Sequence, residues 1–112
     1  MPSDRTKAAF DDILRNIELA LSFTRGLTAD EFEADTLRFY ATTRALEIIS
    51  EASRRLPAEF KRQHSTIPWR DIAAAGNIYR HVYDDVTAER IMQTVQSGLP
   101  ALRKAVEAGT GR

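Results

Sequence analysis

Apolar residues recur along most of the chain at intervals of three and four positions, which is the spacing of one face of an α-helix. The first such face consists of Phe10, Ile13, Leu14, Ile17, Ala20 and Leu21. Ser3 or Asp4 is available as the N-cap, and Gly26 supplies a C-terminal stop. The pattern therefore predicts one long amphipathic helix between this cap and Gly26.

Two further signals mark the next elements. Thr28 to Glu31 has the capping-box form Thr-x-x-Glu and predicts a short helical turn that carries Phe32. From Asp35 the helical spacing resumes and continues until Pro57 ends it. The apolar face of this second long helix consists of Leu37, Ala41, Ala45, Ile48, Ile49, Ala52 and Leu56.

The second half of the chain predicts two more helices. Pro68 fits the first position of a third helix, which follows a linker from Gln63 to Ile67 and continues toward His81. Thr87 can cap a last helix, and Pro100 lies inside that helix and should bend or split it. The apolar stripe of the last helix is Ala88, Ile91, Met92, Val95, Leu99, Leu102 and Val106.

Four long helices joined by short connections predict an all-α fold, an antiparallel four-helix bundle with short extra helical turns. The chain of 112 residues is long enough for one domain, which we expect to span residues 1–112. At this size about two thirds of the extended-chain surface can be buried, so a hydrophobic core needs no covalent crosslink.

Composition excludes several kinds of chemistry. The chain has no cysteine, which excludes disulfide scaffolds, Cys-zinc sites and thiol catalysis. Its two imidazoles are His64, which we expect at the surface of a polar linker, and His81. The carboxylates at Asp11-Asp12, Asp30 to Asp35 and Asp84-Asp85 lack the Glu-x-x-His pair of di-metal bundles. We therefore predict neither a metal site nor a cofactor.

The first residues lack the apolar region of a signal peptide, and no apolar run approaches the length of a membrane span. This pattern predicts a cytoplasmic protein that does not bind a membrane.

The formal net charge of zero is the sum of two opposite halves. Residues 4–35 hold eight acidic and four basic side chains, and residues 36–83 hold four acidic and eight basic ones. One interpretation is that both halves are solvated helix faces that complement each other. The other is that residues 36–83 form a basic surface for RNA or nucleotide phosphate. Neutrality thus argues only against uniform binding of nucleic acid.

Polar and aromatic residues that could carry chemistry are densest between Trp69 and Tyr83. On a helix Asn77 and His81 share a face, so the amide could orient the imidazole. Histidine is an acid or base near neutral pH, and a guanidinium such as that of Arg80 can stabilise a phosphoryl transition state. Together they could cleave RNA through its own 2′-hydroxyl without a metal. A structural cap or a buried hydrogen bond is, however, the more common role of such an Asn/His pair.

Three stretches in order resemble the HepT-like branch of the HEPN superfamily. They are Arg44-Ala-Leu-Glu-Ile-Ile-Ser-Glu-Ala52, Ile67-Pro-Trp-Arg-Asp-Ile-Ala73 and Asn77-x-x-x-His81-x-Tyr83, and the resemblance extends from Phe10 to Val106. It implies a homodimeric helical domain that acts as a metal-independent RNase toxin beside a nucleotidyltransferase antitoxin. In that family the antitoxin adenylylates the motif tyrosine, which corresponds to Tyr83.

The family's site also contains an arginine that is separated from the histidine by four to six intervening residues. Ala74, Ala75 and Gly76 occupy these positions here, so the motif arginine is absent and Gly76 stands beside Asn77 where it would be expected. We predict that His81 and Asn77 are catalytic, that Arg80 substitutes for the missing guanidinium and that Arg70 is a candidate phosphate contact.

The missing arginine keeps two alternatives open. The chain could be a non-catalytic HEPN subunit that binds a nucleotidyltransferase partner or a nucleotide. It could also be a plain helical dimerisation module, in which nothing around His81 matters beyond stability.

Overall fold

The computed structural model describes residues 3–79 and 85–111, and for residues 75–79 and 85–87 it describes the backbone alone. All regular structure in these ranges is helical, as the sequence predicts, and no strand occurs in them. The elements in chain order are α1 (Asp4–Thr24), α2 (Ala29–Ala34), α3 (Thr36–Arg54), α4 (Ala58–Gln63), α5 (Trp69–Tyr79), α6 (Asp85–Gln93), the π-helical segment η1 (Thr94–Gly98) and α7 (Leu99–Thr110).

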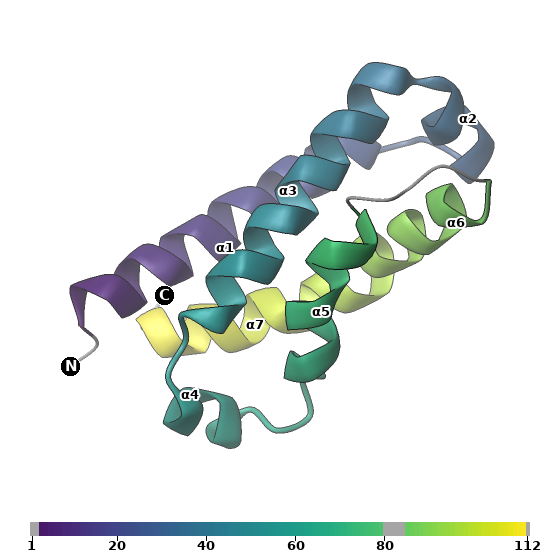
Figure 1. The fold of residues 1–112 in the computed structure, drawn as a ribbon. Helices are drawn as coiled ribbons and strands as arrows, with labels where there is room; N and C mark the ends of the chain where they lie inside the picture. The colour runs from purple at the N-terminus through teal and green to yellow at the C-terminus, as the bar shows by residue number, and fades with distance from the viewer. Residues whose placement is uncertain (1–2, 80–84, 112) are drawn as a thin grey trace.

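The long helices form an elongated antiparallel bundle (Figure 1). Helix α3 runs back along α1, and α6, η1 and α7 together form a third rod beside them. Helix α5 packs against α3, while α2 lies at one end of the bundle and contacts α6. Helix α1 begins and α7 ends at the opposite end. This arrangement confirms the all-α bundle expected from the hydrophobic pattern.

One continuous core joins these helices. Its largest fully buried apolar side chains are Phe10, Ile13, Ile17, Phe32, Ile91, Val95, Leu102 and Val106. These residues come from α1, α2, α6, η1 and α7. Of the face predicted for the second long helix, Ala45, Ile49, Ala52 and Leu56 are buried as well, but Leu37 is 80% exposed, so its place on that face was wrong. Because burial of one large apolar side chain contributes about 1.5–3 kcal/mol, this core is the main source of stability.

Local capping signals set the starts of the first helices. Ser3 accepts a hydrogen bond from the backbone N–H of Thr6 and is the N-cap of α1. Thr28 and Glu31 form the predicted capping box at the start of α2, with both bonds present. Asp35 then caps α3 through the N–H of Arg38. Each bond satisfies a backbone donor that the first helical turn leaves unpaired.

The rod formed by α6, η1 and α7 begins at a different residue from the one predicted. Helix α6 begins at Asp85, so Thr87 lies inside the helix and its prediction as the cap was wrong. An aspartate is a favoured residue type at a helix start, where the helix dipole stabilises negative charge.

Pro100 splits the rod as expected. The backbone N–H of Leu99 bonds the carbonyl of Thr94, five residues back, which closes the π-helical turn of η1. Pro100 then lies at the start of α7, where a missing N–H costs no helical bond. No helix in the described part of the chain is long and apolar enough to cross a membrane.

Candidate functional site

Helix α5 carries Arg70 and Asn77, and its first residue, Trp69, packs against α4. The indole N–H of Trp69 donates to the carbonyls of Lys61 (3.2 Å) and His64 (3.0 Å). The Trp69 ring also packs on Phe60, with 5.9 Å between ring centroids. Trp69 thereby joins α4 to the start of α5.

The His64 ring packs on Phe60 as well, at 4.6 Å between centroids, and the residue is half-buried. The expectation that His64 lies at the surface was wrong. The reason is that His64 is the C-cap of α4, and the chain turns there so that the ring covers Phe60. The His64 ring thus packs on the same Phe60 ring that contacts Trp69 at the start of α5.

A pair of hydrogen bonds ties the middle of α5 to α3. The hydroxyl of Ser50, which is 2% exposed, donates to the carbonyl oxygen of Ala73 at 2.9 Å. The guanidinium of Arg54, one helical turn further along α3, donates to the same oxygen through Nη2. These two donors on one carbonyl fix the position of α5 along α3. The same position determines where the later residues of α5 lie.

The residues of α5 fall on two faces. Pro68, Asp71 and Ile72 line a cavity between α5, α3 and the last rod. At about 100° per residue, Asn77 lies roughly 140° around the axis from Ile72, away from this cavity. Arg70 lies within about 20° of Asn77 and about 10 Å before it along the axis. The structure thus puts Arg70, which is exposed, and the backbone of Asn77 on one face of α5.

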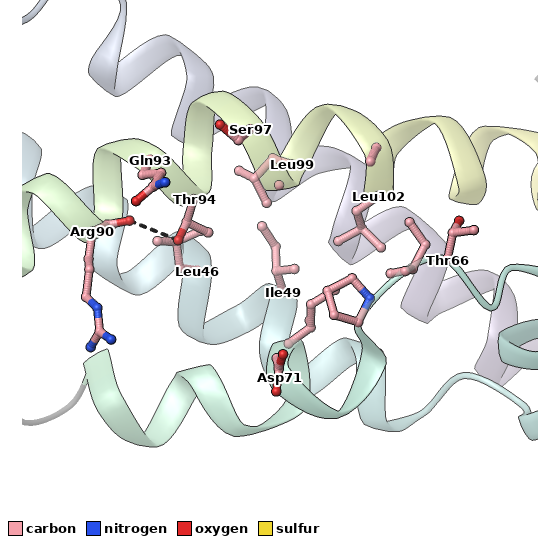
Figure 2. A pocket seen from close by; sticks show the side chains of 15 residues that line it. Leu46, Ile49, Thr66, Asp71, Arg90, Gln93, Thr94, Ser97, Leu99 and Leu102 are labelled. Atoms are coloured by element: carbon pink, nitrogen blue, oxygen red, sulfur yellow. Dashed lines mark hydrogen bonds between the residues drawn. The ribbon is translucent and has the colours of Figure 1, made fainter.

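The cavity has a volume of about 690 Å³ and mainly apolar walls. Figure 2 shows Arg90 at one end, with the hydroxyl of Thr94 bonded to the Arg90 carbonyl, and Asp71 at the rim. The apolar walls are formed by Leu46, Ile49, Ile67, Ile72, Leu99 and Leu102. Such walls suit an apolar group, so this cavity is not where the negative charge of a phosphate backbone would be held.

Three of the predicted site residues, Arg80, His81 and Tyr83, lie outside the described residues, and Asn77 is described by its backbone alone. The structure therefore brings together Arg70 and the Asn77 backbone on one helix face. The roles predicted for the other three residues stay predictions.

Ion pairs neutralise part of the basic stretch. They join Arg38 to Asp35 at 3.2 Å, Arg44 to Glu47 at 3.6 Å and Arg55 to Asp12 at 2.7 Å. The hydrogen bond to Asp12 raises the pKa of the Arg55 guanidinium above its ordinary value, so it stays charged. The Arg55 pair joins α3 to α1 and agrees with the interpretation that acidic and basic halves complement each other.

Four basic side chains of the same stretch make no ion pair with any described residue: Arg54, Lys61, Arg62 and Arg70. Arg54 and Arg70 belong to the α3–α5 side of the molecule, and Lys61 and Arg62 belong to α4. Some cations of the basic stretch are therefore neutralised by acidic neighbours, whereas these four are not, and the interpretation of the stretch as a surface for RNA or nucleotide phosphate stays a prediction.

Comparison with known proteins identifies the family. The family model described as "Ribonuclease HepT-like" matches residues 13–108. The chain belongs to the HepT-like ribonuclease family. It is 39% identical over 101 residues to "Probable ribonuclease HepT" of Thermococcus cleftensis, covering 90% of this chain and 92% of that protein.

Two further relatives match over a similar length of the chain. "Putative RNase TTE0752" of Caldanaerobacter subterraneus subsp. tengcongensis is 34% identical over 97 residues, covering 87% of each chain. "Putative RNase MJ1380" of Methanocaldococcus jannaschii is 33% identical over 101 residues, covering 90% of this chain and 93% of that protein. No solved structure matches the chain.

Two residues of this HepT-like domain were not singled out as site residues by the sequence, namely Ser50 and Arg54. Both belong to or follow the stretch Arg44 to Ala52 that carries the family resemblance. Their spacing of four residues places them on one face of α3, but only the packing of α5 shows that this face meets Ala73. Within the described residues, no group of three or more His, Asp or Glu side chains is placed to hold a metal ion.

Proposed function

We propose that this HepT-like protein is a metal-independent RNA endonuclease. The observation that carries the proposal is the match of the ribonuclease family over residues 13–108, which includes the Asn77-x-x-x-His81-x-Tyr83 motif. The register of α5 supports it, because α5 carries Asn77 and leads directly into Arg80 and His81. The expected substrate is RNA, and the proposal needs no cofactor.

The chemistry follows from the residue types. His81 accepts the proton of a ribose 2′-hydroxyl, and the 2′-oxygen forms a bond to the adjacent phosphorus. The bond from phosphorus to the 5′-oxygen breaks, and this oxygen leaves with a proton, from His81 of a second site or from water. The products are a 2′,3′-cyclic phosphate and a 5′-hydroxyl. Asn77 orients the imidazole, Arg80 stabilises the negative charge of the transition state, and Arg70 contacts a neighbouring phosphate.

Cleavage of RNA in the presence of EDTA tests this proposal. The purified chain is incubated with several structured and single-stranded RNAs, and products are compared between the wild type and His81→Ala. We expect cleavage by the wild type, with cyclic-phosphate ends, and its loss in His81→Ala. Absence of cleavage across varied RNAs would overturn the proposal.

We further propose that the protein is the toxin of a toxin–antitoxin module and acts in the cytoplasm, where its RNA substrate is found. Its antitoxin would be a nucleotidyltransferase that transfers adenylate from ATP to the Tyr83 hydroxyl, releasing pyrophosphate. The toxin would be a homodimer whose two sites meet at the interface. The support for this proposal is the position of Tyr83 two residues after His81, as the family resemblance implies.

Incubation with a small nucleotidyltransferase encoded beside the gene, ATP and Mg²⁺ tests the control step. Wild-type protein should gain the mass of one adenylate per chain and lose cleavage activity, whereas Tyr83→Phe should gain none. Equal labelling of Tyr83→Phe would reject Tyr83 as the modified residue. A monomer in sedimentation analysis would reject the paired-site assembly.

Gly76 favours a second candidate function, because it leaves the motif without its arginine. Loss of one donor to a transition-state anion costs about a hundredfold or more in rate. The alternative is a non-catalytic subunit that binds a nucleotidyltransferase partner or a nucleotide. Its signature would be stable co-purification with that partner and no toxicity when the chain is expressed alone.

A further inference from the structure

Arg54 brings a guanidinium to the part of α5 where the HepT-like motif has lost its own. This side chain is exposed, and its Nη2 donates to the carbonyl oxygen of Ala73. The Ala73 bond occupies one of the five N–H donors of the guanidinium, and Arg54 makes no ion pair with any described residue. Several donors and the full positive charge therefore stay available to an anion.

Helix geometry places this guanidinium beside Asn77. In an α-helix the carbonyl of residue 73 points toward the backbone N–H of residue 77, about 3 Å away. A donor on the Ala73 oxygen therefore lies within about 6 Å of the Asn77 backbone nitrogen. Gly76 precedes Asn77 in the same turn and has no side chain to occupy the surrounding space.

We infer that Arg54 is a phosphate-binding residue of the site, and that from α3 it acts together with Arg80 to compensate for the guanidinium that position 76 of α5 lacks. Its ligand is a phosphate of the RNA backbone. This inference rests on the proposed ribonuclease function and adds a cation whose position the structure describes. Arg70, on the same face of α5 one helical turn before Ala73, would contact the next phosphate along the strand.

The neighbouring Ser50 separates phosphate binding from a structural role. Ser50 and Arg54 donate to the same oxygen of Ala73, so either substitution removes a bond that anchors α5. Arg54→Ala also removes a cation, whereas Ser50→Ala does not. If Arg54 only anchored α5, the two substitutions would have similar effects on activity.

The first experiment measures kcat/KM for RNA cleavage. We expect a loss of about a hundredfold in Arg54→Ala and a change of a few-fold at most in Ser50→Ala. Arg62→Ala, which removes an exposed cation of α4, should cleave like the wild type. Adding Gly76→Arg to the Arg54→Ala variant should raise kcat/KM at least tenfold above the value for Arg54→Ala alone. Equal losses in Ser50→Ala and Arg54→Ala, or full activity of Arg54→Ala, would overturn the inference.

The second experiment does not depend on cleavage. Binding of a single-stranded RNA is measured at increasing salt in the His81→Ala background, with and without Arg54→Ala. Loss of one phosphate contact should reduce the slope of log Kd against log salt by about 0.7. If the wild type does not cleave but this slope changes, the ribonuclease proposal fails while Arg54 keeps its role. If the slope is unchanged, the inference fails even where cleavage succeeds.

Discussion

A β-carbon on Gly109 of α7 would lie 2.6 Å from Cε1 of Phe60 in α4, so the two residues are in contact only because residue 109 is glycine. Cζ of Phe10 lies 3.0 Å from the same point. The Phe10 and Phe60 rings themselves pack at 5.1 Å between centroids and 60° between planes. The last helix thus closes over an aromatic pair contributed by α1 and α4.

Gly109→Ala should destabilise the protein even though alanine is the better helix former. Alanine stabilises an exposed helical position by about 1 kcal/mol relative to glycine. Here the added carbon overlaps two rings, and overpacking of a core costs about 1–3 kcal/mol. We expect a lower midpoint in urea unfolding followed by circular dichroism.

Gly98→Ala is the matched control. A β-carbon there would meet only Cγ2 of Thr94, at 3.9 Å, which is ordinary contact. This variant should be as stable as the wild type or more stable by up to about 1 kcal/mol. If Gly109→Ala also gained stability, the close approach of α7 to Phe60 would be wrong.

The ion pair between Asp12 and Arg55 should show measurable coupling. Arg55 donates to Asp12 at 2.7 Å and to Glu51 at 3.3 Å, and its side chain is 21% exposed. A double-mutant cycle of Asp12→Asn and Arg55→Gln should give a coupling of about 0.5–1 kcal/mol in the free energy of unfolding, because networks that join two helices exceed isolated surface pairs.

The Asp35–Arg38 pair provides a comparison within one helix. The guanidinium-bearing side chain of Arg38 is 46% exposed, against 21% for Arg55, and the two partners are only three residues apart. We expect a coupling of about 0.5 kcal/mol or less for this pair. Equal couplings, or no decrease of the Asp12–Arg55 coupling in high salt, would contradict the role assigned to the network.

The capping box of α2 should make stability depend on pH. The backbone N–H of Thr28 donates to Glu31, and this bond, together with the Thr28 hydroxyl, lowers the pKa of the Glu31 carboxyl below its ordinary 4.5. A carboxyl whose pKa is lower in the folded state stabilises the fold above pH 4.5, and that contribution is lost as pH falls through the folded-state pKa.

Comparison of the wild type with Glu31→Gln checks this direction. Glutamine can accept the same bond but carries no charge. The wild type should be the more stable protein at pH 7, and the difference should disappear as the solution is acidified through the folded-state pKa of Glu31. A difference that stays constant from pH 7 to pH 3 would show that Glu31 titrates as in the unfolded chain.

Features that depend on neighbours in the sequence were predicted well. The Ser3 cap, the Thr28–Glu31 capping box and the break at Pro100 each follow from residues within five positions, and each is present. The predicted start of α6 was too late by three residues, because a helix capped by Thr87 would begin at Ala88 whereas α6 begins at Asp85, and the local sequence does not choose between the two starts. The half-buried position of His64 depends on Phe60 and could not be read from the polar linker around it.

The features of the candidate site likewise divide into those visible in the sequence and those that depend on tertiary packing. Its motif residues Asn77, His81 and Tyr83 and the absence of an arginine at Gly76 are visible in the sequence. The link between Arg54 and Ala73 is not, because 19 residues separate them and their contact depends on how α5 packs on α3.

The sequence by itself determined the helices, the family and the chemical types available to the site, because helical periodicity, caps and motifs are short-range properties of a chain. Only the tertiary structure decided which helix faces meet, where glycine permits a close approach, and which cations are neutralised. These outcomes depend on contacts between residues far apart in the chain, and their energies exist only once the helices are packed. The sequence alone therefore does not distinguish Gly109 and Arg54 from their neighbours, because the contacts that make them important form only in the packed structure.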